Sequence, residues 1–276
     1  MTGDRLVRLG LIGLFLGYLL VPIAATVLFS VSTRWDRTML PEGLTGEWYS
    51  GVFVEPEFVT ALGRSILISA ATVVGSVLLV APTAYWVQIR LPEGRGLVEL
   101  VTILPFGVPA VVLALAIVRF YAGPPIDIGR TPLMLILACM VITLPFMYRP
   151  IANALAAVDV RVLTEAAQSL GARWPTILLR VVAPNIWWGI VSGSLLVFTT
   201  VFAELTLATL VTGARFKTLP MLLVEWTRQD GRLASALSVV SLAVAFGISI
   251  LAIWIGTRRA AAHLDEPRSE VEPCPT

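Results

Sequence analysis

Six stretches without Asp, Glu, Lys, Arg or His dominate the sequence, and each is long enough to cross a lipid bilayer. They cover residues 9–33, 65–89, 100–118, 131–148, 181–203 and 233–257. About 20 helical residues at ~1.5 Å each cover a hydrocarbon core of ~30 Å. Backbone polar groups in lipid need partners within their own segment, so each stretch is expected to be a helix. The sequence predicts an all-α integral membrane protein.

Composition agrees with this fold class. Only 14% of the 276 residues are charged, against about 25% in an average soluble domain. We expect a short terminal segment at 1–8, a six-helix transmembrane domain at 9–257 with a polar loop at 149–180, and a disordered tail at 258–276. The first stretch exceeds the ~7–15 residues of a signal-peptide core, so it is expected to be retained. Arginines divide almost evenly between the two sides, so charge bias leaves the orientation open.

Several kinds of chemistry lack the residues they need. The single lysine, Lys217, follows Phe216, so there is no phosphate-binding G-x-x-x-x-G-K-[ST] loop. The single histidine, His263, lies in the tail, which argues against Ser/His/Asp triads and histidine-based zinc sites. Cys139 and Cys274 lie far apart in the predicted topology, so no disulfide bond between them is expected. The net charge of +2 gives no reason to expect nucleic acid binding. We therefore expect a protein that is not an enzyme and holds no cofactor or metal.

Three functional classes stay open from the residues alone. No predicted span carries Asp, Glu, Lys, Arg or His in its interior, whereas ion-coupled secondary transporters usually place such a residue there. Sodium held by backbone carbonyls keeps that alternative open. A non-transport membrane scaffold or enzyme would need convergent polar groups in a loop. A permease that receives its energy from a partner is the third class.

The polar loop contains one amphipathic segment, residues 163–171 with its flanks. One predicted face is apolar, and the other is polar. The apolar face comprises Val160, Leu163, Ala167 and Leu170, and the polar face Asp159, Arg161, Thr164, Glu165 and Gln168. Gly171 stands where a helix would end in a left-handed residue, and Pro175 where a second helix could begin. Pro184 marks the next break. Spacing alone is also consistent with a helix lying on the membrane or on its own bundle.

The spacing of these residues resembles the EAA loop of ABC-importer permeases. The matching residues are Glu165-Ala166-Ala167, Gly171 and Pro184, while Val181 and Ala183 stand where isoleucine and leucine are usual. The resemblance implies a coupling helix that docks into a cytosolic ATPase. The implied docking residues are Leu163, Glu165, Ala166, Ala167, Leu170, Gly171 and Pro184.

Further segments resemble permeases of the polyamine and 2-aminoethylphosphonate branches. They are residues 41–49, 63–65, 104–109, 144–149 and 218–220, so the resemblance runs from about residue 10 to about residue 257. It implies a MetI-like six-helix fold in the bacterial inner membrane with both termini cytoplasmic. It also implies two ATPase subunits that bind ATP and Mg, a second permease and an extracytoplasmic binding protein. The implied solute is polyamine- or aminoethylphosphonate-like.

Two further features are candidates for a pathway or gate. Pro105, Gly107 and Pro109 are expected to bend the third span, either as an ordinary kink or as the place where a pathway opens. Glu204 ends the fifth span, where it either reaches interfacial water or lines the outer mouth and favours an amine. Apolar segments at 205–211 and 219–226 predict short helices folded back over that mouth.

Overall fold

The computed structural model describes residues 2–35, 38 and 40–264. The chain forms two compact units. One comprises Met1–Ser65 and Ala214–Val244, and the other comprises Ile66–Gly213 and Ala245–Thr276. Two long helices, α3 (Pro56–Arg90) and α12 (Gly231–Leu264), contribute residues to both units. The units are described separately below.

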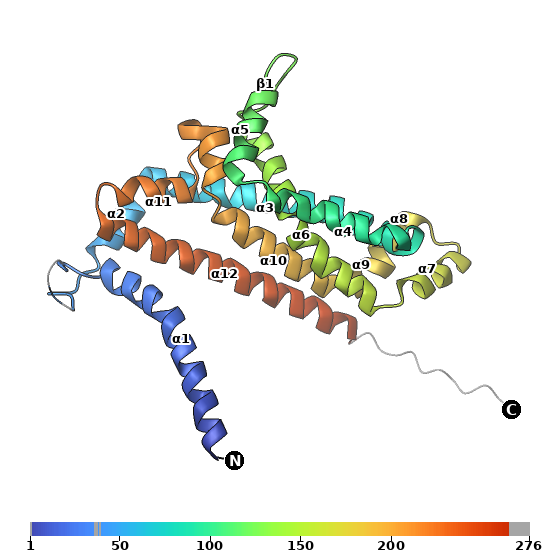
Figure 1. Ribbon diagram of the computed structural model, residues 1–276, viewed down its shortest axis with the longest axis horizontal. Coiled ribbons are helices and arrows are strands. Elements are labelled where there is room, and N and C mark those ends of the chain that lie inside the picture. Colours follow the sequence, from blue (N-terminus) through green and yellow to red (C-terminus); the bar gives the residue numbers. More distant parts are fainter. Residues whose placement is uncertain (1, 36–37, 39, 265–276) are drawn as a thin grey trace. The chain divides into compact units, whose positions relative to one another are not determined.

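Four helices are long and apolar enough to cross a membrane, which confirms the predicted all-α membrane fold. They are α1 (Thr2–Ser30), α3, α6 (Pro132–Ala157) and α12, drawn in Figure 1. Two helix pairs pass the same test together but are bent. Pro92–Gly107 meets Ala110–Tyr121 at 93°, and Trp174–Asn185 meets Trp187–Phe202 at 80°. The described chain therefore has six spans if each bent pair counts as one.

Several helices extend beyond the predicted uncharged stretches. α3 begins at Pro56 rather than Ser65. α6 continues past Arg149 and through Pro150, because a charged residue ends an uncharged stretch of sequence but does not end a helix. α12 continues to Leu264, past the predicted end at Thr257. The predicted disordered tail from residue 265 onward lies outside the described residues.

Short elements complete the first unit. They are α2 (Glu47–Val54) and α11 (Leu219–Thr227), and the second of these matches the predicted short helix at 219–226. Ser65 Oγ accepts a hydrogen bond of 2.8 Å from the Leu219 N–H, which ties the start of α11 to α3. The Trp48 indole N–H donates to the Ser32 carbonyl at 2.9 Å. Hydrogen bonds between distant parts of the sequence thus fix these short elements.

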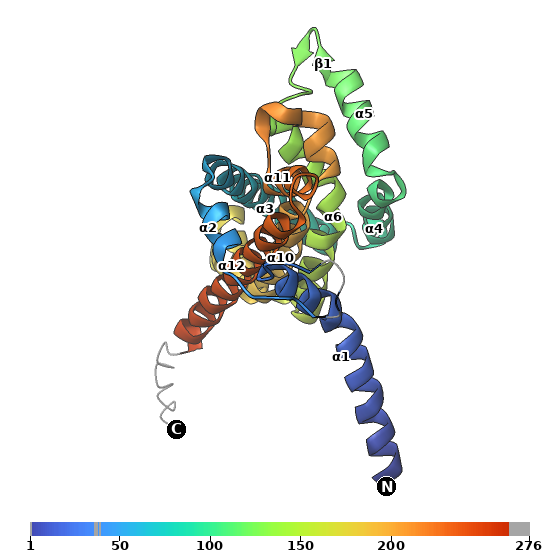
Figure 2. The same ribbon diagram turned by 90° about the vertical axis from the view of Figure 1, so that its left-hand side faces the viewer.

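The second unit holds the remaining helices and one hairpin. Its elements are η1 (Pro92–Gly94), α4 (Arg95–Ile103), η2 (Leu104–Gly107), α5 (Ala110–Tyr121), β1 (Ala122–Gly123), β2 (Ile126–Asp127), α6, α7 (Val160–Ser169), α8 (Trp174–Thr176), η3 (Ile177–Val182), α9 (Ala183–Asn185), α10 (Trp187–Phe202) and η4 (Ala208–Thr212). β1 and β2 pair antiparallel at the end of α5, as Figure 2 shows.

The core of this unit is the packing of α6 on α10, which lie side by side in Figure 1. Two glycines of α10 allow the helices to approach closely. A Cβ on Gly189 would lie 2.6 Å from Ala154 Cβ and 2.7 Å from the Pro150 carbonyl oxygen. A Cβ on Gly193 would lie 2.9 Å from the Met147 sulfur. Small residues at such a crossing are typical of membrane helix pairs.

The bend between η2 and α5 lies where the sequence predicts one. Val108 is extended, with φ −96° and ψ 120°, and Pro109 begins α5 as its N-cap. Pro105 is the second residue of η2, and its missing N–H breaks the preceding helix. The second bend, at Ile186, interrupts the predicted span 181–203, and the sequence predicts a break there from the proline that precedes it. It lies just beyond Pro184.

Candidate functional site

The start of α7 is fixed by a side-chain cap. Asp159 Oδ1 accepts a hydrogen bond of 3.2 Å from the Val162 N–H, one of the backbone donors without a helical partner. An Asp directly before an apolar-periodic segment is a recognised start signal, so this cap was readable in the sequence. It places the first turn of α7 at Val160.

The end of α7 is a left-handed glycine, as the sequence predicts. Gly171 has φ +77° and donates to the Gln168 carbonyl at 2.9 Å. The Ala172 N–H donates to the Ala167 carbonyl at 3.0 Å. This pair of bonds is the Schellman motif, which satisfies carbonyls that the helix leaves free. Gly171 therefore separates α7 from the second arm of the loop.

The predicted faces of α7 are wrong at two positions. Thr164, placed on the polar face, is only 4% exposed and lies on the buried side with Val160 and Ala167. Its hydroxyl donates to the Val160 carbonyl at 2.7 Å, so burial leaves no donor unsatisfied. Leu170, placed on the apolar face, is 88% exposed because it is the C-cap and lies beyond the last helical turn. Leu163 is half-buried.

The outward side of α7 carries both apolar and charged groups. Leu170, Val162 and Ala166 are exposed, as is Glu165. The Arg161 guanidinium pairs with Glu165 Oε1 at 3.1 Å along the helix surface. Both side chains of this pair are well exposed, so it contributes little to stability.

The second arm of the loop begins where Pro175 predicts. α8 starts at Trp174 with Pro175 in its first turn, and η3 follows with π-type hydrogen bonds. Ile177 and Val182 of η3 are buried, whereas Pro184 in α9 is half-buried. Buried side chains of η3 thus hold the second arm to its own unit.

Tyr85, on the part of α3 that belongs to the same unit, meets both arms. Its hydroxyl lies 3.1 Å from Thr164 Oγ1, and its ring meets the Trp174 ring edge-on with centroids 6.3 Å apart. Tyr85 is 3% exposed. No local sequence pattern indicates this contact, because 79 positions separate Tyr85 from Thr164.

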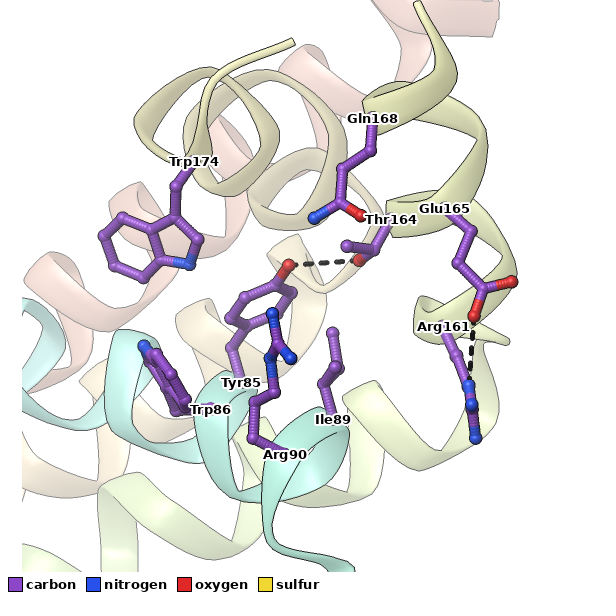
Figure 3. A pocket seen from close by; sticks show the side chains of 9 residues that line it. All are labelled: Tyr85, Trp86, Ile89, Arg90, Arg161, Thr164, Glu165, Gln168 and Trp174. Atoms are coloured by element: carbon purple, nitrogen blue, oxygen red, sulfur yellow. Dashed lines mark hydrogen bonds and ion pairs between the residues drawn. The ribbon is translucent and has the colours of Figure 1, made fainter. Parts of the chain in front are cut away.

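A pocket of about 210 Å³ lies beside this contact. Figure 3 shows the residues that line it, which come from α3, α7 and α8. They are Tyr85, Trp86, Ile89, Arg90, Arg161, Thr164, Glu165, Gln168 and Trp174. The Arg90 guanidinium lies 5.7 Å from the centroid of the Trp86 ring.

The remaining candidates lie on other elements of this unit. Pro105 and Gly107 belong to η2, and Pro109 caps α5. Glu204 is half-buried, and its Oε1 accepts a 2.9 Å hydrogen bond from the Leu207 N–H. Glu204 therefore caps the turn that precedes η4. In the described part of the chain, no group of three His, Cys, Asp or Glu residues is placed to hold a metal ion.

Comparison with known families decides what kind of protein this is. Residues 81–266 match the family described as "Binding-protein-dependent transport system inner membrane component". The chain belongs to this family. It is a multi-pass permease subunit of a bacterial ABC importer in the inner membrane. Such a permease is non-catalytic, and the nucleotide is bound by partner ATPases. This assignment excludes the secondary-transporter and scaffold alternatives.

The relatives of the permease are distant, and each match covers most of both chains. It is 26% identical over 259 residues to the spermidine/putrescine transport system permease protein PotC of Escherichia coli K12, covering 90% of this chain and 94% of the relative. PotC of Haemophilus influenzae is 29% identical over 82% of this chain and 89% of its own length. PotB of the same organism is 27% identical over 72% of this chain and 74% of its own length.

Solved structures show the same fold. A chain of a bacterial alginate ABC transporter, in complex with its alginate-bound periplasmic protein, superposes with a TM-score of 0.73 at 14% identity, covering 94% of this chain and 96% of the other. A chain of the MetNI methionine ABC transporter superposes with a TM-score of 0.55 at 16% identity, covering 74% of this chain and 94% of the other. These similarities confirm the predicted MetI-like fold and do not address the solute. The permease works in a complex with ATPases and a periplasmic binding protein.

Proposed function

We propose that α7 is the coupling helix of this permease and that its outward side docks on a partner ATPase. The observation that carries the proposal is that Leu170 is 88% exposed at the end of a capped helix whose other side is buried. An apolar side chain held rigidly in that position gains free energy when a groove covers it.

The docking surface combines Val162, Glu165, Ala166 and Leu170. Ala166 is small and exposed, so a groove could approach the helix backbone there. Ala167 and Leu163 support the surface from below, and Gly171 sets the angle at which the second arm leaves. Pro184 belongs to that second arm and fixes where it breaks before α10.

This assignment determines the proposed orientation. If α7 meets a cytosolic ATPase, the loop 149–180 faces the cytosol. With six spans, both termini then lie on the cytoplasmic side, and the loops after the first, third and fifth spans face outward. The proposed domain scheme is residues 1–8 inside, 9–257 in the membrane domain and 258–276 inside.

We further propose an amine-bearing solute and a second, different permease subunit. Relatives named as spermidine/putrescine permeases include both PotC and PotB, and the chain resembles each. A polyamine is therefore favoured, and an aminoethylphosphonate-like solute is the second candidate. Glu204 would favour a cation at the outer mouth.

The bent pair at Pro109 is the proposed gate. Pro105 and Pro109 remove two helical N–H donors within five residues, and Gly107 leaves open space around its Cα. A segment with few internal hydrogen bonds changes its backbone angles at lower cost than a continuous helix.

The docking proposal is tested by co-purification of the ATPase encoded with this permease. Leu170→Asp and Glu165→Lys should each reduce the ATPase recovered by about ten-fold or more, the effect of losing a buried contact. Leu44→Asp is the matched control, because Leu44 is also exposed, at 70%, but lies on the proposed outer side. Full recovery of the ATPase with both docking variants would show that α7 is not the docking helix.

A further inference from the structure

Tyr85 is an α3 side chain that contacts both arms of the coupling loop, the proposed docking loop at 149–180. Its hydroxyl meets Thr164 on α7, before Gly171, and its ring meets Trp174 on α8, after Gly171. Figure 3 shows the phenol hydroxyl facing Thr164, with the Trp174 indole on the other side of the phenol. A single buried side chain therefore joins α3 to the loop on both sides of its glycine.

The direction of the Tyr85–Thr164 hydrogen bond follows from the number of hydroxyl protons available. A threonine hydroxyl has one proton, and Thr164 donates it to the Val160 carbonyl at 2.7 Å. The Tyr85 hydroxyl must therefore be the donor in the 3.1 Å contact with Thr164 Oγ1. The two side chains are 3% and 4% exposed, so a hydroxyl that loses this bond stays in a buried position.

Packing alone does not hold α7 to α3 at this point. The pocket of about 210 Å³ lies directly beside the bond and is lined by α3, α7 and α8. Where side chains leave such a space, the separation of two helices depends on the specific contacts that remain. Here α7 is held to α3 by the Tyr85–Thr164 hydrogen bond, and α8 is held to α3 by the ring contact between Tyr85 and Trp174.

We propose that Tyr85 and Thr164 are positioning residues that pass movement of the docked coupling helix to α3. The inference rests on the proposed docking role of α7 and deepens it. Binding of the ATPase to the exposed side of α7 moves a helix whose buried side is bonded to a candidate membrane span. The hydrogen bond makes α3 follow α7, so a nucleotide-driven step reaches the membrane domain.

Hydrogen–deuterium exchange on the complete, solubilised transporter tests this without knowledge of the solute. Exchange is compared between the nucleotide-free and the ATP–vanadate-trapped states, for peptides covering α7 and for those covering residues 82–90 of α3. In the unaltered permease, nucleotide trapping should change exchange in both peptides. In Tyr85→Phe and Thr164→Val, the change at α7 should persist, while the change at α3 falls by about two- to ten-fold, the effect of one hydrogen bond.

Three controls make the result specific. Thr164→Ser keeps the hydroxyl and should restore the α3 response. Thr83→Val removes an exposed hydroxyl of α3 that donates only to the Leu79 carbonyl at 2.6 Å, and should change nothing. The double variant should be no worse than either single variant, because both remove the same bond. If Thr164→Val fails to assemble, Tyr85→Phe still decides the question.

The outcomes separate the inference from the docking proposal. Unchanged exchange at α3 on nucleotide trapping of the unaltered permease overturns the inference. A change in exchange at α3 in Tyr85→Phe as large as in the unaltered permease also overturns it. So does a Thr164→Ser variant as defective as Thr164→Val, or loss of the ATPase from Tyr85→Phe, since the bond would then serve docking alone. Failure of the docking proposal looks different, because α7 would then show no protection when the ATPase binds.

Discussion

The Ala172 N–H donates to the Ala167 carbonyl at 3.0 Å, closing a turn around a glycine with φ +77°. This turn ends the proposed docking helix and directs the chain into its second arm. Residues on either side of the turn then meet the same tyrosine of α3. The geometry of the loop 149–180 therefore depends on one backbone conformation and one buried hydrogen bond.

Gly171→Ala should weaken ATPase association while leaving the permease in the membrane. A Cβ at Gly171 has open space, so the cost is the left-handed backbone alone, about 1–2 kcal/mol. That cost corresponds to roughly a ten-fold loss of association, measured by co-purification or by binding in nanodiscs.

Gly247→Ala is the matched control for this variant. Gly247 lies in α12, also with open space around a Cβ, and has no left-handed backbone. It should retain full association with the ATPase. Equal losses in the two variants would remove the left-handed turn from the explanation.

The α6–α10 packing predicts unequal effects of two similar substitutions. Gly189→Ala forces a methyl to within 2.6 Å of Ala154 Cβ and 2.7 Å of the Pro150 carbonyl oxygen, so the helices must separate. Overpacking of this kind costs about 1–3 kcal/mol. At Gly193 the nearest atom is the Met147 sulfur, at 2.9 Å, near the end of a flexible side chain that can shift. The unfolding temperature in detergent should therefore fall further for Gly189→Ala than for Gly193→Ala. The reverse order would refute this account of the packing.

Substitutions at the first bend test whether it works as a gate. A Cβ at Gly107 meets nothing within 4 Å, so Gly107→Ala should assemble normally. Pro109→Ala restores a backbone donor and makes a continuous helix more favourable across the 93° bend. Both variants should lower spermidine uptake several-fold with unchanged ATPase recovery. Wild-type uptake in both variants would leave the bend as an ordinary kink.

Lys217 gives a prediction for pH dependence. Its Nζ lies 2.8 Å from Glu225 and 3.2 Å from Glu57, and these hydrogen bonds raise the lysine pKa above its ordinary value of 10.5. A raised folded-state pKa means that the contribution to stability is complete below the unfolded pKa and is lost as pH rises through the folded value. The stability difference between wild type and Lys217→Met should thus be constant from pH 7 to 9 and shrink above pH 10.5.

The expected difference is small because the three side chains are 26%, 54% and 43% exposed for Lys217, Glu57 and Glu225. Melting temperatures measured at several pH values would reveal it. A difference that grows above pH 10.5 has the wrong sign and would exclude this ion-pair cluster as the cause.

The main features of the fold were predictable because they depend on local sequence. Runs without charge located the helices, and Gly171 and Pro175 located the turn and the second arm, since each has a backbone requirement of its own. The extents of α3 and α6 were not predictable, because their polar ends continue the helical hydrogen bonds outside the apolar stretches.

The faces of α7 depend on tertiary contacts, and here the sequence misled. Thr164 counts as polar in any periodicity, yet it is buried because Val160 and Tyr85 satisfy its hydroxyl. Leu170 counts as apolar, yet the Schellman turn places it outside the helix, where it is exposed. Tyr85 and Trp174 were missed altogether, since nothing in the local sequence marks a contact between distant segments.

Photo-crosslinking from Leu170 tests the docking of α7 most directly. A photoreactive amino acid at this position, in the transporter purified with its ATPase, should give a crosslinked product of permease and ATPase. The same amino acid at Leu44, which is exposed on the proposed outer side, should give none. No product from Leu170 while the ATPase co-purifies, or an equal yield from Leu44, would contradict the assignment of α7 as the coupling helix.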